Sequence, residues 1–163
     1  MKIKNVLIAV LCLFTSVSFA QTSDAEAEAM INLLGVQKKE AISQFVQVSA
    51  KDSVAFWKIY EEYNTLNKKT AVTRIKLYEK TVLAYDNLSP VKADSLANQY
   101  FRNRSDQEKT LETYYKKIKT ATNANVAFQF FQAEVYLLTQ IRAQIMMQIP
   151  TYGQLANMAK KEK

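Results

Sequence analysis

Apolar residues recur at three- and four-residue steps along most of this chain, which is the period of amphipathic α-helices. Only Gly35, Pro90, Pro150 and Gly153 punctuate the pattern. The intervals between them are too long for strands and too regular for disorder. The pattern therefore predicts an all-α fold built from four helical segments.

The first two predicted helices meet at Ser49. Ser23 and Glu26 form a capping box, which indicates where the first helix begins. Ser49 is the predicted cap of the second helix, and Asp52 stands near the positive end of its dipole. We expect this second helix to run from about residue 50 to residue 86, a rod of roughly 55 Å. The apolar face expected for the first helix consists of Met30, Leu33, Leu34, Ala41, Phe45 and Val48.

The third and fourth helices are predicted from a second cap and a second break. Ser89 is placed to cap a helix that starts at Pro90, where the missing N–H does no harm, and that ends near Lys119. A polar turn at residues 120–123 leads to a fourth helix that Pro150 ends. Long helices joined by short turns predict a long antiparallel hairpin. The positions expected to face inward are Phe56, Ile59, Tyr60, Tyr63, Leu66, Ile75, Tyr78, Val82 and Tyr85 in the second helix, Ala93, Leu96, Tyr100, Leu111, Tyr114 and Ile118 in the third, and Val126, Ala127, Phe130, Phe131, Leu138, Ile141 and Ile145 in the fourth.

The first twenty residues have the order of a secretory signal. Lys2 and Lys4 precede an apolar run at residues 6–13, and small residues end the segment at Ala20. A membrane anchor is the alternative, but the apolar core is shorter than the ~20 residues that a spanning helix needs. We therefore expect cleavage after Ala20 and export to the periplasm.

The composition of the remaining chain excludes several kinds of chemistry. The full sequence contains no histidine, and its one cysteine, Cys12, belongs to the predicted signal, so the remaining chain has neither residue. Disulfides, thiol nucleophiles, histidine-based triads and zinc sites built from Cys and His are thereby excluded, and we expect no cofactor and no metal. Nucleic acid is a poor partner for an exported chain without a basic stripe. We expect one helical domain at residues 21–150 and a flexible basic tail at residues 151–163.

Three groups of residues are candidates for function. The aromatic cluster at residues 56–63 is either core packing or, in part, a binding surface. Glu134 borders an apolar face, where a structural ion pair or a tyrosine hydrogen bond is favoured over a general base, since no second acid or histidine accompanies it. The basic residues of the second and third helices form either a solvated face or, if that face is concave, an amphipathic cradle.

The order of these features resembles the Spy/CpxP-like family of small periplasmic proteins, the LTXXQ-motif group. The resemblance rests on residues 38–42, 48–53 and 56–63, continues through residues 88–90, and resumes at residues 130–134 and 142–150. It implies an elongated, curved helical cradle that often dimerises through antiparallel hairpins. It also implies ATP-independent holding of unfolded envelope proteins and partnership with envelope-stress sensors.

Two functions follow as expectations. The favoured one is a periplasmic, non-enzymatic, chaperone-like protein that holds unfolded or stress-damaged envelope proteins. The alternative is an accessory regulator that docks on a membrane sensor, and a carboxylate-based enzyme remains a third, minor candidate. The residues predicted to contact a client or partner are Trp57, Tyr60, Tyr63, Lys68, Lys69, Arg74, Tyr78, Arg102, Arg104 and Arg142.

Overall fold

A computed structural model of the chain describes residues 37–149, 151, 153 and 154. The predicted signal, the capping box at Ser23, the first half of the first predicted helix and most of the predicted tail lie outside the described residues. Within the described part every regular element is helical and no strand occurs, which confirms the all-α prediction.

The second and third predicted helices begin at the expected caps. Helix α3 spans Ala50–Ala84, and the Ser49 side chain accepts a hydrogen bond from the backbone N–H of Asp52. Helix α4 spans Pro90–Ala121, and Ser89 caps it in the same way. A 3-10 turn, η1 at Tyr85–Asn87, joins the two helices. Each cap supplies an acceptor for a backbone donor that has no partner inside the helix.

The last long helix, α5, spans Ala124–Gln148, and its cap Asn123 accepts from the backbone N–H groups of Asn125 and Val126. An earlier helical segment covers residues 37–45 and is followed by a non-helical stretch at residues 46–49. Val48 therefore lies beyond the first helix, although its side chain still packs against the core.

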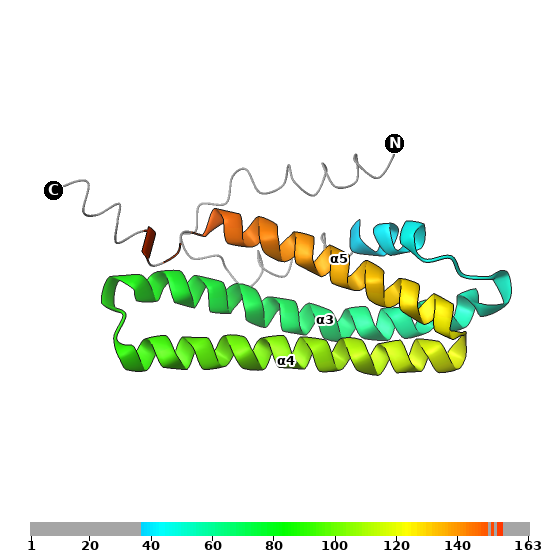
Figure 1. The fold of residues 1–163 in the computed structure, drawn as a ribbon, viewed down its shortest axis with the longest axis horizontal. Helices are drawn as coiled ribbons and strands as arrows, with labels where there is room; N and C mark the ends of the chain where they lie inside the picture. The colour runs from blue at the N-terminus through cyan, green and yellow to red at the C-terminus, as the bar shows by residue number, and fades with distance from the viewer. Residues whose placement is uncertain (1–36, 150, 152, 155–163) are drawn as a thin grey trace.

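Helices α3 and α4 lie side by side and run in opposite directions, while α5 crosses obliquely over α3 (Figure 1). Side-chain contacts fix this direction: Tyr63 packs on Tyr114, and Tyr78, one half-length further along α3, packs on Tyr100. The described part of the molecule is thus elongated. Of the long helices, only α3 and α4 reach the end near η1 (Figure 1).

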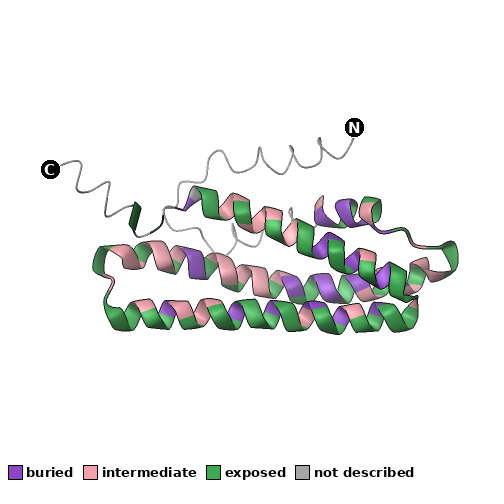
Figure 2. Cartoon of the chain, viewed as in Figure 1, coloured by how far each residue is buried: buried purple, intermediate pink, exposed green. Residues whose placement is uncertain are grey.

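The hydrophobic core lies at the opposite end, where residues 37–46, α3, α4 and α5 meet. Buried positions concentrate in this half of α3 and α5, while the outer side of α4 is exposed (Figure 2). Phe130 of α5 contacts the rings of Phe56, Tyr60 and Tyr63 at centroid distances of 6.5, 6.4 and 5.2 Å. Edge-on packing of this kind adds to the stabilisation from burial alone. The core consists of Ile42, Val46, Phe56, Tyr60, Tyr63, Leu111, Tyr114, Ile118, Val126, Ala127, Phe130 and Ala133.

Two positions predicted to face inward are exposed. Leu66 is 43% exposed and Phe131 is 38% exposed. Phe131 follows Phe130 directly, and consecutive helical side chains point about 100° apart, so both rings cannot enter one core. Polar side chains take part of the interior instead: Asn103 and Gln107 of α4 are buried at the middle of the hairpin.

Candidate functional site

Three of the tyrosines predicted to contact a partner are buried. Tyr60 and Tyr63 are fully buried and Tyr78 is 5% exposed. Their rings pack on other rings between the helices, because all three lie on the face of α3 that meets α4 and α5. In the folded protein a partner could reach them only after the helices separate, so their burial gives no support to the prediction that they bind a client or partner.

Trp57 is partly buried at the edge of the core. Its ring packs edge-on against Phe56 and Tyr60, with centroids 5.0 and 5.5 Å apart. The Lys39 ammonium lies 5.6 Å from the Trp57 ring centroid and also forms an ion pair with Glu61. Trp57 thus closes the core and has a lysine over one face of its ring, so it offers a partner little open aromatic surface.

Two of the predicted basic residues line an open groove between α3 and α4. Lys69 and Arg102 stand there with Lys80, beside Asp106, around a volume of about 480 Å³. Arg104 is exposed on α4 but does not line this groove. The basic residues predicted to contact a partner therefore lie on separate surfaces, and the structure does not bring them together at one place.

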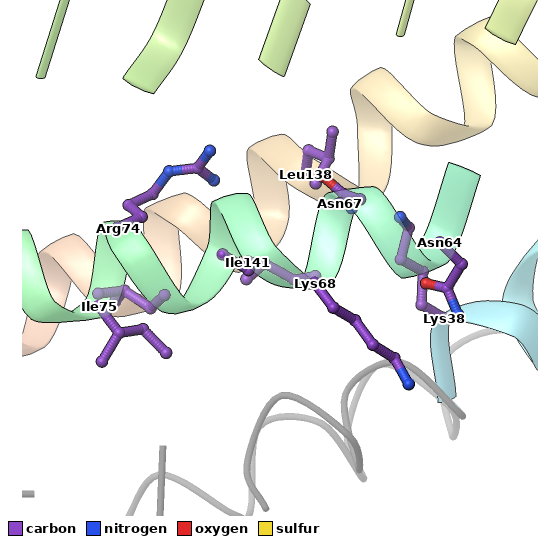
Figure 3. Close-up of a pocket in the computed structure, with 10 residues that line it drawn as sticks. Lys38, Asn64, Asn67, Lys68, Arg74, Ile75, Leu138 and Ile141 are labelled. Carbon is purple, nitrogen blue, oxygen red and sulfur yellow. The ribbon is translucent and has the colours of Figure 1, made fainter. Parts of the chain in front are cut away.

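Lys68 and Arg74 line a different and smaller hollow, the α3–α5 cavity, of about 70 Å³ (Figure 3). Leu138 and Ile141 reach it from α5, and Figure 3 shows Arg74 extending from α3 away from Ile75 and toward α4. Most of the wall is apolar, with cationic groups at its borders. The remaining lining residues are Lys38, Asn64, Asn67, Ala71 and Ile145.

Arg74 belongs to a polar seam that joins all three long helices. Its Nε donates to Asn103 Oδ1 at 2.9 Å and its Nη2 donates to Gln107 Oε1 at 2.7 Å. Arg142 of α5 donates to the same Gln107 oxygen at 3.3 Å. We call Arg74, Asn103, Gln107 and Arg142 the arginine seam. Burial lowers the pKa of the Arg74 guanidinium, and the nearby charge of Arg142 lowers it further.

A second buried polar group joins residues 37–45 to the core. Lys38 Nζ lies 2.7 Å from Glu134 Oε2, and both side chains are almost inaccessible. The Tyr63 hydroxyl donates to the same carboxylate oxygen at 2.7 Å, and the Lys38 ammonium lies 5.0 Å from the Tyr63 ring centroid. Glu134 is thus held by an ion pair and a tyrosine hydrogen bond, as the favoured interpretation of its sequence position predicted.

Burial and the Glu134 carboxylate raise the pKa values of the Tyr60 and Tyr63 hydroxyls, burial being the larger cause for both. The folded state therefore keeps both protons at a pH where the unfolded chain, with tyrosine pKa values near 10, loses them. The stabilisation that comes from these two protons is fully present below pH ~10. Above that pH the free energy of unfolding should fall by about 1.4 kcal/mol per pH unit for each tyrosine. We expect urea midpoints to drop steeply between pH 10 and pH 11, and Tyr63→Phe to make that drop shallower. An unchanged slope in Tyr63→Phe would contradict this assignment.

A row of exposed apolar side chains lies on α5 and is not predicted from the sequence. Phe128 is 51% exposed and Val135 is 41% exposed, and with Phe131 they follow the spacing of one helix face. The rings of Phe128 and Phe131 stack at 6.4 Å, and Tyr115 of α4 packs edge-on against Phe131 at 6.3 Å. We call Phe128, Phe131 and Val135 the α5 apolar row. The signal available in the sequence was the Phe130–Phe131 pair, whose members must point in different directions.

No group of three or more His, Cys, Asp or Glu side chains that could hold a metal ion occurs among residues 37–149 and the few described beyond them. None of the described helices is long and apolar enough to cross a membrane. Comparisons of the sequence with protein-family models, with curated proteins and with solved structures find no match. The surfaces described above are therefore the basis on which a function is inferred.

Proposed function

We propose that the protein is a periplasmic, ATP-independent, chaperone-like binding protein that holds unfolded or stress-damaged envelope proteins and has no catalytic role. The observation that carries the proposal is the α5 apolar row, in which large apolar side chains stay open to solvent on one face of a helix. Contiguous apolar side chains on a soluble protein often mark a surface that binds other proteins. The signal-like order of residues 1–20 supports the proposed location.

The dimensions of the row suit loose contact with an extended chain. From Phe128 to Val135 the helix rises about 10 Å, which corresponds to roughly three residues of an extended client. A contact this small buries little area and releases readily, so holding requires no nucleotide cycle. The basic groove between α3 and α4 adds a positive field that favours acidic or anionic clients.

The proposal is tested by light scattering of an aggregating client protein. We expect the full-length protein to suppress scattering at equimolar amounts, and the double variant Phe128→Gln/Val135→Gln to lose most of this suppression while keeping its helical circular dichroism. Both replaced side chains are exposed, so their loss removes contacts to a client and leaves the core intact.

The matched control is Val91→Gln/Phe101→Gln, which replaces the same two residue types at exposed positions of α4, 80% and 69% exposed. These positions lie in the half of α4 away from Tyr115 and the α5 apolar row. We expect this variant to suppress scattering as well as the parent. Equal losses in both variants would show that the row is not the binding surface. Capture of one dominant protein from envelope extract would instead support the accessory regulator.

A further inference from the structure

The arginine seam contains more hydrogen-bond donors than acceptors. Gln107 Oε1 accepts from Arg74 and from Arg142, which fixes the orientation of the amide, since turning it over would aim its NH₂ group at two guanidinium groups. The Gln107 Nε2 then points elsewhere, and it is buried without a hydrogen-bond partner. Gln107 as a residue is 3% exposed, so water is largely kept from this donor.

Asn103 does not relieve the excess of donors. Its oxygen accepts from Arg74 Nε, and its amide nitrogen donates to the backbone carbonyl of Thr70. Each guanidinium carries five N–H donors, and the described contacts use only Nε and Nη2 of Arg74 and Nη2 of Arg142. The unused polar groups of the seam are therefore all donors.

The seam also carries positive charge without a matching carboxylate. The ion pairs formed among the described residues involve lysines, and neither arginine of the seam takes part in one. Two like charges share one amide oxygen in a partly buried place, an arrangement that costs stability unless an anion compensates it. Burial is the largest cause that lowers the pKa of the Arg74 guanidinium, Arg142 lowers it further, and the groups that raise it are Tyr78 and Tyr63 rather than an Asp or Glu.

We propose that the arginine seam is an oxyanion-binding site, in which a carboxylate or phosphate group accepts hydrogen bonds from the guanidinium N–H groups of Arg74 and Arg142 that the seam leaves unused. Guanidinium groups match the planar, two-oxygen edge of these anions. Arg74 also lines the α3–α5 cavity, whose walls include Ile75, Leu138 and Ile141. An anion that carries a short alkyl chain could therefore place the chain there and bind more tightly than a free anion. The site is independent of the proposed holding function, which uses the α5 apolar row.

Thermal unfolding of the full-length protein tests the site. A ligand that binds only the folded state raises the melting temperature, and for a protein of this size we expect a rise of roughly 4 °C or more with millimolar inorganic phosphate or octanoate. Sodium chloride at matched ionic strength is the reference, because general screening also affects a basic protein. A larger rise with octanoate than with phosphate identifies an alkyl-bearing anion as the ligand class, and equal rises identify the free oxyanion. No rise with either anion would overturn the proposal.

Two arginine variants show whether the anion sits in the seam. Arg142→Gln is expected to abolish the response to both anions. Arg104→Gln is the matched control, because it removes the same charge from an exposed position of α4 that has no contact with the seam, and it should keep the full response. A response that survives in Arg142→Gln, or that is lost equally in Arg104→Gln, would overturn the assignment.

A third variant supplies the missing acceptor from the protein itself. Gln107→Glu places a carboxylate between the two guanidinium groups, so it should raise the melting temperature in chloride and remove the response to added phosphate. The loss of the phosphate response separates an anion site from a seam that only packs the helices together, because a carboxylate between two arginines would raise the melting temperature in either case. A lower melting temperature with an intact phosphate response would contradict the proposal.

Discussion

Replacing Glu134 with glutamine is expected to lower the free energy of unfolding by about 3–5 kcal/mol. The change replaces one carboxylate oxygen with an NH₂ group, so it removes the negative charge and leaves the side-chain volume almost unchanged. It leaves the Lys38 ammonium, which lies 2.7 Å from Glu134 Oε2, buried without a counter-ion. Breaking a buried ion pair by removing one partner costs far more than a surface pair contributes. Urea unfolding followed by Trp57 fluorescence measures the loss, since this ring packs on the core.

The double variant Lys38→Met/Glu134→Gln separates lost attraction from an unpaired charge. Methionine fills the space of the lysine stem, and glutamine can still accept from the Tyr63 hydroxyl. We therefore expect the double variant to recover most of the stability that either single variant loses. Glu61→Gln is the control for charge alone, because Glu61 pairs with Lys39 at the surface and should change stability little. Strictly additive losses from Lys38 and Glu134 would show that the two groups are not coupled.

The sequence determined the helices well because their ends carry strong local signals. Ser49 and Ser89 are both followed by helices that start at the next residue, as predicted. The predicted end of the third helix near Lys119 lies two residues before the observed end at Ala121. Caps and helix-breaking residues act over a few positions, so they can be read without knowledge of the tertiary structure. The curvature expected from the Spy/CpxP-like resemblance, and the resemblance itself, stay predictions.

The inward faces are predicted less completely by the sequence, because amide side chains are typical of exposed positions. Asn103 and Gln107 were not expected to be buried, yet they continue the three- and four-residue steps that link the buried α4 residues Leu96 and Leu111. A count of positions alone places both amides on the inner face. What the sequence does not show is that Arg74 and Arg142 supply their partners from two other helices.

The burial of the tyrosines that were predicted to contact a partner was not foreseen for a related reason. An amphipathic tyrosine suits both a core edge and an exposed surface, and its neighbours in sequence do not distinguish the two. Helix α5 helps to bury these rings, because its Phe130 packs against Phe56, Tyr60 and Tyr63. That contact joins residues about seventy positions apart, which local pattern alone cannot specify.

Replacing Phe130 with alanine is expected to lower the free energy of unfolding by about 3–5 kcal/mol, the usual cost of removing a buried phenylalanine. The Phe130 ring is fully buried, and it meets three aromatic rings of α3 edge-on. Its loss leaves a cavity where α5 meets α3, and the long α3–α4 pair cannot close around it without bending. Urea unfolding by circular dichroism should show an earlier midpoint for the whole helical signal.

The matched control for Phe130→Ala is Phe128→Ala, the same replacement two residues earlier in the same helix. Phe128 is 51% exposed, so its truncation should change the free energy of unfolding by less than about 1 kcal/mol. The two variants also separate folding from binding: Phe130→Ala should weaken the fold, whereas Phe128→Ala should keep the fold and weaken client holding. If Phe128→Ala destabilised the protein as much as Phe130→Ala, the α5 apolar row would be part of the core, and the surface on which the proposed function rests would not exist.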